Sequence, residues 1–205
     1  MSDQSSGVWR YVGRFLYHIT DVDNVSSIAE AGLQSHNRAH GGYRPTDISD
    51  PEVQDRRRRI CDPHYGRQLH NYVCLYFRAN GPMLYRRKQH QRRLAVLYVD
   101  SSVLGMPRVV FTDGNAASPH TEFYYSPDDL QKLDWTCLKA RYWTAFLYGK
   151  RKRCAEVLVP DEVPVKLINR VVVHNDWARA RIGPTLWPVE VRPEYCFKDD
   201  SHTQS

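Results

Sequence analysis

The 205-residue chain has no run of about 18 apolar residues, so its sequence predicts no membrane-spanning helix. Residues 1–7 are polar and lack the apolar core of a secretory signal, so we expect a cytoplasmic protein. The five cysteines are odd in number and form no CxxC pair, which argues against a disulfide framework and a cysteine-based zinc site. The nine histidines include no HExxH pair, and we therefore expect no metal.

Several chemical motifs are also missing. The chain contains no GxGxxG fingerprint, no phosphate-binding P-loop and no convincing Ser–His–Asp arrangement. Its composition is typical of a globular protein, with 41% hydrophobic and 25% charged residues, and its length suits one large domain. We predict this domain over residues 15–197, with flexible tails at 1–14 and 198–205. The net charge of +6 favours phosphate-rich partners.

Short apolar runs alternate with helix signals along the chain. Asp50 followed by Pro51 predicts a helix start that leads into Arg56–Arg59, whereas the polar stretch 34–46 reads as a loop. A helix capped by Thr20 and ended by Gly32 should follow the first strand. This mixture indicates the α+β class, with a split or mixed β-sheet and flanking helices. The predicted strands cover 15–20, 72–77, 94–99, 109–111, 155–159 and 166–174.

Basic residues gather in three places, at 56–59, 86–93 and 150–153. Aromatic residues between 135 and 148 precede the third cluster, and a basic groove with aromatic stacking platforms suits single-stranded nucleic acid. The alternative is equally open on charge alone: solvated basic faces, with the tryptophans in the core.

Two residues stand out by position. Glu156 lies at the start of an apolar strand, shortly after the four basic residues 150–153, so its carboxylate faces either solvent or a cleft. His18 lies where a strand ends and a helix begins, a common place for ligands. Taken alone, each has an ordinary alternative, an edge-strand glutamate and a hydrogen-bonded structural histidine.

Six segments occur in a recognisable order along the chain: Leu16–Thr20 with Asn24 and Ile28, Val53–Arg57, Tyr72–Phe77 with Pro82–Tyr85, Phe111–Ala116, Leu133–Trp135 and Arg151–Val159. Together they resemble the DarT family of DNA ADP-ribosyltransferase toxins. The resemblance implies an ADP-ribosyltransferase fold, a split mixed sheet with helices around an NAD cleft. It also implies transfer of ADP-ribose from NAD to a base of single-stranded DNA, and a DarG-like macrodomain antitoxin as partner.

The resemblance also implies roles. Cleavage of the bond between nicotinamide and ribose passes through an oxocarbenium-like state, which a carboxylate stabilises, and Glu156 occupies the family's glutamate position. Arg56 is our candidate for the functional arginine, and Arg57 is the alternative, because the run of four arginines leaves the alignment ambiguous. This arginine would either clamp the NAD pyrophosphate or assist proton removal from the acceptor base. The remaining NAD-binding candidates are His18, Ile19 and Thr20 at the nicotinamide end, with Ser27 and Ser35.

The segment 112–152 should recognise the acceptor, since it precedes the glutamate. The family includes thymidine-modifying and guanosine-modifying branches, and the residues around Asn115 and Cys154 lean towards guanosine. Two other functions stay open from the sequence. One is ADP-ribosylation of RNA or protein, and the other is a non-catalytic module that binds single-stranded nucleic acid.

Overall fold

The computed structural model describes residues 11–195. Part of the predicted N-terminal tail packs on the domain, because the ring of Tyr11 stacks on Trp135 at 5.8 Å and the carbonyl of Arg14 accepts a hydrogen bond from Ser101 N at 3.0 Å. The rest of that tail and the predicted tail 198–205 lie outside the described residues. Within 11–195, every helix is too short or too polar to cross a bilayer.

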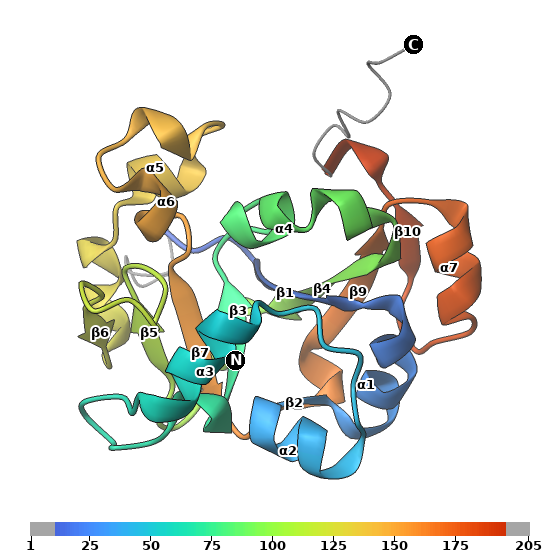
Figure 1. Ribbon diagram of the computed structural model, residues 1–205, viewed down its shortest axis with the longest axis horizontal. Coiled ribbons are helices and arrows are strands. Elements are labelled where there is room, and N and C mark those ends of the chain that lie inside the picture. The colour runs from blue at the N-terminus through green and yellow to red at the C-terminus, as the bar shows by residue number, and fades with distance from the viewer. Residues whose placement is uncertain (1–10, 196–205) are drawn as a thin grey trace, which may run out of the picture.

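A mixed eight-stranded sheet runs through the middle of the molecule (Figure 1). Its order is β10-β9-β4-β1-β3-β7-β5-β6; only β10 and β9 pair in parallel, and a small second sheet pairs β2 with β8. The α+β class and the mixed sheet are as the sequence indicates. The strands are β1 Phe15–Asp21, β2 Leu33–Gln34, β3 Tyr72–Tyr76, β4 Leu94–Asp100, β5 Val110–Thr112, β6 Phe123–Tyr124, β7 Glu156–Pro160, β8 Glu162–Val163, β9 Ile168–Val173 and β10 Val189–Val191.

The large sheet is split at its centre. Strand β1 pairs with β4 along its whole length, but with β3 it shares one register pair, Tyr17 opposite Tyr76. Beyond that pair the two strands separate, which divides the sheet into the halves β10-β9-β4-β1 and β3-β7-β5-β6. Because paired backbone groups end at this point, β1 and β3 turn polar groups towards the gap between them.

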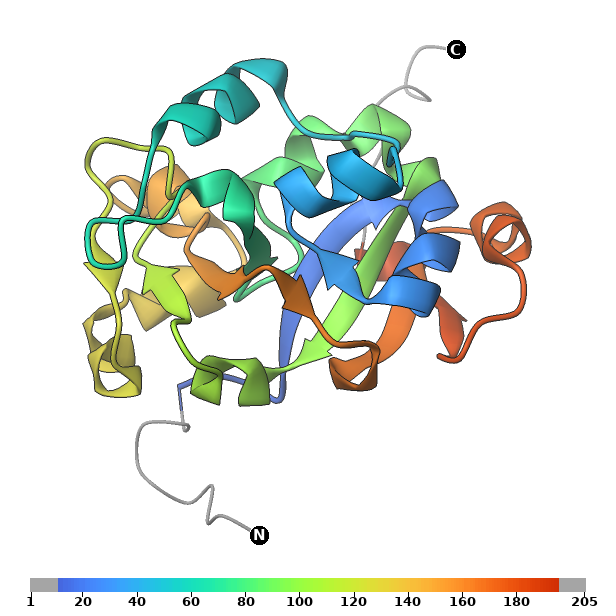
Figure 2. The same cartoon turned by 90° about the horizontal axis from the view of Figure 1, so that it is seen from below.

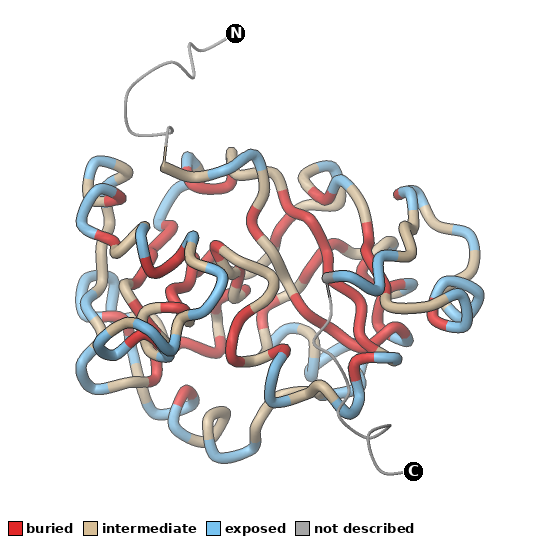
Figure 3. The backbone as a smooth tube through the Cα atoms, turned by 90° about the horizontal axis from the view of Figure 1, so that it is seen from above, coloured by how far each residue is buried: buried red, intermediate tan, exposed pale blue. Residues whose placement is uncertain are grey.

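Helices cover the sheet and leave its strands as the buried centre of the fold (Figure 3). Helix α3 crosses in front of β3 and β7, while α5 and α6 gather at the β5–β6 end and α7 lies at the opposite end beside β10 (Figure 1). The view from below shows α2 and α3 on the same side of the sheet (Figure 2). The helices are α1 Val25–Ala31, α2 His36–Gly42, α3 Pro51–Arg59, α4 Pro82–Arg86, α5 Trp135–Lys139, α6 Gly149–Lys152 and α7 Asp176–Ile182.

The predicted start of α3 is confirmed, since the Asp50 carboxylate accepts hydrogen bonds from the N–H groups of Glu52 and Val53. Two other boundaries differ. Strand β1 continues to Asp21, which caps a short 3-10 turn in place of Thr20, so α1 begins only at Val25. The predicted loop 34–46 is wrong over α2, a helix that its polar and glycine-rich sequence does not announce.

Candidate active site

A cavity of about 560 Å³ lies at the split between β1 and β3, a size typical of small-molecule and cofactor sites. Strands β1, β3 and β7 form its floor, and α2, α3 and the segment between them supply its walls. Five of the sequence-predicted residues line it: His18, Ile19, Thr20, Ser27 and Glu156. Segments distant in the chain therefore meet at the one place where the sheet is open.

Glu156 and Arg57 form a buried ion pair at the centre of this cavity. The Arg57 Nη1 donates to Glu156 Oε2 at 2.9 Å, and the side chains are 8% and 2% exposed. Burial by itself would lower the pKa of Arg57, but Glu156, Cys74 and Tyr76 together outweigh burial and raise that pKa above its usual range. The guanidinium thus stays charged and holds the carboxylate in place.

The structure brings Arg57 rather than Arg56 to the glutamate. Arg56 is exposed on α3, and among the described residues that line the cavity neither Arg56 nor Ser35 is found. Ser35 is buried at the start of α2, where its backbone N–H donates to the carbonyl of Asp161 at 2.7 Å. Its place in the structure is therefore the junction of α2 with the β7–β8 turn.

The start of β7 holds Glu156 rigidly. Its backbone N–H donates to the hydroxyl of Thr112 at 3.2 Å, and that hydroxyl donates to the carbonyl of Gly114 at 2.7 Å. Tyr76 lies directly opposite Glu156 in the sheet, so Tyr17, Tyr76 and Glu156 form one row across the split. Burial, with Cys74 and Glu156 nearby, raises the pKa of the Tyr76 hydroxyl well above its usual value. Tyr76 is thus a neutral wall of the site, which the sequence analysis missed.

His18 bridges the split. Its Nδ1 lies 2.9 Å from the carbonyl oxygen of Cys74, which only accepts, so Nδ1 carries the proton and Nε2 keeps a lone pair. Burial lowers the pKa of His18 against the smaller effect of that hydrogen bond. A neutral His18 can therefore accept a hydrogen bond from a hydroxyl of a ligand in the cavity.

The segment between α2 and α3 is clamped over the cavity by Asn24. The amide of Asn24 donates to the carbonyl of Thr46 at 2.9 Å and accepts from the N–H of Thr46 at 2.8 Å, and it also donates to the Thr20 hydroxyl. This two-way hydrogen bond fixes the wall that carries Asp47. No sequence motif announces this clamp, because it joins residues 22 positions apart.

Histidines line the wall formed by α2. The His36 ring lies 4.1 Å from both His40 and His70, measured between ring centroids. Burial, with His36 and Arg57 nearby, lowers the pKa of His70 to about 4. His36, His40 and Asp47 also bring one ligand atom each within 4.8 Å of one another, an arrangement of metal-ligand type within residues 11–195. The spacing His36-x-x-x-His40 was the sequence signal for it.

The segment before Glu156 carries exposed aromatic residues. Tyr142 and Tyr148 are 63% and 70% exposed, and Tyr148 adopts a left-handed backbone with φ of 54°. Gly149 follows it, where a Cβ would lie 1.8 Å from the carbonyl oxygen of Trp143. The turn that presents these rings therefore requires a glycine at 149.

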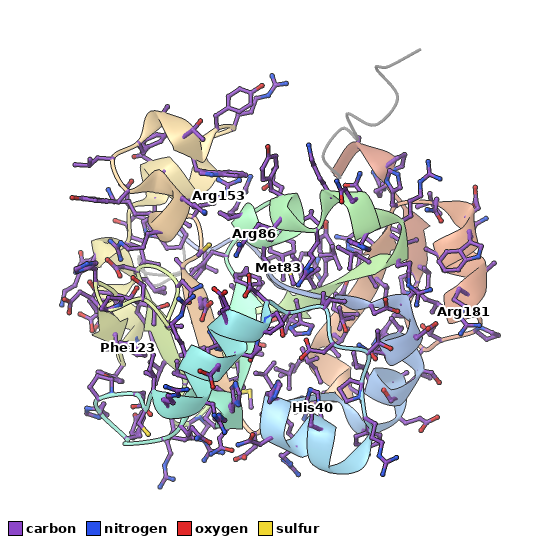
Figure 4. All side chains as sticks on the ribbon, viewed as in Figure 1. His40, Met83, Arg86, Phe123, Arg153 and Arg181 are labelled. Atoms are coloured by element: carbon purple, nitrogen blue, oxygen red, sulfur yellow. The ribbon has the colours of Figure 1, made fainter. Side chains whose placement is uncertain are left out.

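Most of the basic run before Glu156 serves the fold. Arg151 makes two hydrogen bonds to Asp113 at 2.7 and 3.0 Å, and Lys152 pairs with Asp134 at 2.8 Å. Arg153 is 1% exposed and lies between α6 and α4 (Figure 4), where it donates to several backbone carbonyls. Lys150 alone of the four is exposed, and it lines the cavity. Within the basic cluster 150–153, three cations thus pair inside the fold, and Lys150 is the exposed member.

A split mixed sheet around a cavity with a buried glutamate and a paired arginine is the arrangement expected of an ADP-ribosyltransferase. The model of one family, described as ssDNA thymidine ADP-ribosyltransferase, DarT, matches residues 17–202. The chain belongs to this DarT family and is an NAD-dependent DNA ADP-ribosyltransferase. The resemblance seen in six short segments is confirmed.

Relatives match along most of the chain. The DNA ADP-ribosyl transferase of Thermus sp. (strain 2.9) is 31% identical over 90% of this chain and 94% of its own. Its structure in complex with ADP-ribosylated ssDNA superposes with a TM-score of 0.77 and 27% identity, covering 90% of this chain and 96% of that one, and a further structure of it holds NAD+. A fusion of a DNA ADP-ribosyl transferase with a DNA ADP-ribosyl glycohydrolase from Thermosipho africanus is 32% identical over 79% of this chain and 43% of its own.

Proposed function

We propose that this chain binds NAD in the cavity at the split and transfers its ADP-ribose to thymidine in single-stranded DNA, with release of nicotinamide. The observation that carries the proposal is the buried Arg57–Glu156 pair facing a cavity large enough for a dinucleotide. The description of the matching family supports thymidine as acceptor, over the guanosine towards which the sequence leaned.

Glu156 is the proposed catalytic carboxylate. When the bond from nicotinamide to C1′ breaks, positive charge develops on the ribose, and nicotinamide leaves as a neutral molecule. A buried carboxylate stabilises that charge and can accept a hydrogen bond from the ribose 2′-hydroxyl. The new bond forms between C1′ and a ring nitrogen of the base, and the proton of that nitrogen is released to water. Glu156 is held in a fixed position at the start of β7, so it needs little reorganisation during the step.

Arg57 takes over the role that the sequence analysis gave to Arg56. Its guanidinium has five donors, of which one bonds Glu156, so others are available to the pyrophosphate of NAD. Since it stays charged, it acts by position and charge, and it does not serve as the proton acceptor.

His18, Ile19 and Thr20 form the proposed nicotinamide end of the site, because all three line the cavity beside the split. The lone pair on His18 Nε2 suits a ribose hydroxyl. Ser27 is a weaker contact candidate, since its hydroxyl already donates to the carbonyl of Asn24 at 2.9 Å. Exposed Tyr142 and Tyr148 are the proposed stacking surfaces for unpaired bases.

The proposed biological setting is a toxin whose mark is removed by a DarG-like macrodomain, as the Thermosipho africanus fusion pairs the two activities in one chain. The protein would act in the cytoplasm, where NAD and DNA are both present. Addition of a DNA ADP-ribosyl glycohydrolase to the modified oligonucleotide should restore its original mass.

The test is mass spectrometry of oligonucleotides after incubation with NAD. Single-stranded DNA, duplex DNA and RNA, each with all four bases, would run in parallel with wild type and Glu156→Gln. We expect one ADP-ribose on thymidine of single-stranded DNA, and a loss of at least 100-fold in the variant while NAD binding persists. Modification of RNA or protein instead, modification of guanosine alone, or wild-type turnover by folded Glu156→Gln would each contradict the proposal.

Arg57→Lys and Arg56→Lys form the matched pair for the arginine. Arg57→Lys removes the forked guanidinium that contacts the glutamate. Arg56→Lys changes the neighbouring side chain of the same helix, which is exposed. Activity should fall only in Arg57→Lys. An equal fall in both variants would contradict the assignment.

A further inference from the structure

A second cluster of chemistry-bearing side chains lies on the α2 wall, outside the Glu156–Arg57 pair. It consists of His36 and His40 from α2 and Asp47 from the segment that follows, and all three line the cavity. The side chains of His40 and Asp47 are 39% and 42% exposed, so the cluster lies where the cavity opens to solvent. Figure 4 labels His40 on α2.

The spacing of the donors suits a metal ion. His36 and His40 are four positions apart on one helix, so their rings lie on the same face. One ligand atom from each of the three residues lies within 4.8 Å of the others, and His40 Nε2 is 3.9 Å from Asp47 Oδ2. Tetrahedral zinc with bonds of about 2.0–2.2 Å places its ligand atoms roughly 3.3–3.5 Å apart. Small side-chain rotations would close the remaining distance.

Neighbouring contacts hold two of the donors ready. Asp47 Oδ1 accepts from the N–H of Ser49 at 2.7 Å, which leaves Oδ2 directed towards His40. The His36 ring packs at a tilt against the rings of His40 and His70, and the His70 ring is itself hydrogen-bonded to Gln54 at 2.9 Å. Such supporting contacts are what orient ligands in known metal sites.

The charge around the cluster also permits a cation. Arg57 acts on His36 electrostatically, but its charge is balanced by Glu156 at 2.9 Å. Asp47 adds a carboxylate that a cation would neutralise. Two imidazoles with one carboxylate are a ligand set of the kind that binds Zn²⁺ in sites with an open fourth position.

We propose that His36, His40 and Asp47 form a binding site for a divalent transition-metal ion of the zinc class, at the rim of the NAD cavity. The ion would join α2 to the segment between α2 and α3. This site is separate from the transfer chemistry, in which the metal has no assigned part.

The test is titration of the metal-free full-length protein with Zn²⁺ by calorimetry, and with Co²⁺ by its visible absorption. We expect one equivalent to bind and a tetrahedral Co²⁺ spectrum. His40→Ala and Asp47→Asn should each weaken binding by at least about tenfold. These residues are exposed, and unchanged circular dichroism and melting temperature would show that both variants fold.

His64→Ala is the matched control. His64 is an exposed histidine stacked on Tyr125, three residues from the exposed thiol of Cys61, so it offers a competing surface site. Zinc affinity should be unchanged in this variant. Binding that is lost in His64→Ala, binding that survives both cluster variants, or no binding to wild type would each overturn the proposal.

Discussion

The ion pair between Arg57 and Glu156 gives the sharpest test of the structure. Replacing Glu156 by Gln leaves the Arg57 cation buried without a carboxylate, and replacing Arg57 by Met leaves the carboxylate without its cation. The exposures of 8% and 2% place this pair in the buried regime, where removing one partner costs about 3 kcal/mol, against 0–1 kcal/mol for a surface pair. For a domain of this size, that corresponds to a fall in melting temperature of about 6–12 °C.

The double variant distinguishes an ion pair from two independent contributions. With Arg57→Met and Glu156→Gln combined, no unpaired charge remains buried, so the total loss should be close to that of one single variant. The coupling free energy would then be about 3 kcal/mol. Urea unfolding followed by circular dichroism at pH 7 measures all four proteins. Arg56→Met, on the exposed side of the same helix, should change the free energy of unfolding by less than about 0.5 kcal/mol.

Additive effects of the two substitutions would refute the pairing. So would a loss in Arg56→Met equal to that in Arg57→Met, since this result would place the other arginine of the run at the glutamate.

Three further predictions rest on other parts of the site. Because the pKa of His18 is lowered in the fold, the unfolded chain takes up a proton at this residue below about pH 6.5. His18 should therefore reduce the free energy of unfolding on acidification by up to about 1.4 kcal/mol per pH unit. In urea titrations from pH 7 to 5, His18→Asn should lessen that slope, whereas His90→Asn, at an exposed histidine, should not. Gly149→Ala should displace the turn that holds Tyr148 and weaken binding of single-stranded DNA in fluorescence anisotropy, with NAD affinity retained; equal DNA affinity would contradict the required close approach. Lys150→Ala should weaken DNA binding and reduce the slope of log K against log salt by about 0.7, and an unchanged slope would remove Lys150 from the phosphate contacts.

The sequence marks the register of the arginine run only through a small difference in helical angle. Helix α3 has one apolar residue beyond its first proline, Val53, and an apolar residue marks the face that packs inward. Arg57 lies four positions after Val53, about 40° around the helix from it, whereas Arg56 lies three positions after Val53, about 60° away on the other side. The structure places Val53 and Arg57 together in the cavity wall. Composition alone could not make this distinction among four identical neighbours.

The fate of the basic run could not be predicted in the same way. The partners of Arg151 and Lys152 are Asp113 and Asp134, which lie 38 and 18 positions earlier in the chain. Arg153 finds mostly backbone carbonyls, which every sequence has and no motif reveals. A count of charges therefore describes the net field of the protein, but not which cations remain exposed for a phosphate. That depends on long-range packing.

The split itself explains why the site lies where it does. The apolar strands were predictable, since β3, β4 and β7 bury largely apolar runs and β1 buries Leu16 and Ile19, but the single pair between Tyr17 and Tyr76 was not. Two strands that separate leave N–H and C=O groups that need partners. One carbonyl of β3 accepts from His18, and other polar groups of the gap face the cavity, where a polar ligand can satisfy them. The opening in the sheet thus supplies a polar surface inside an apolar core. The same row of residues that closes the split at Tyr17 and Tyr76 continues to Glu156, so the gap and the carboxylate are placed together by one strand register.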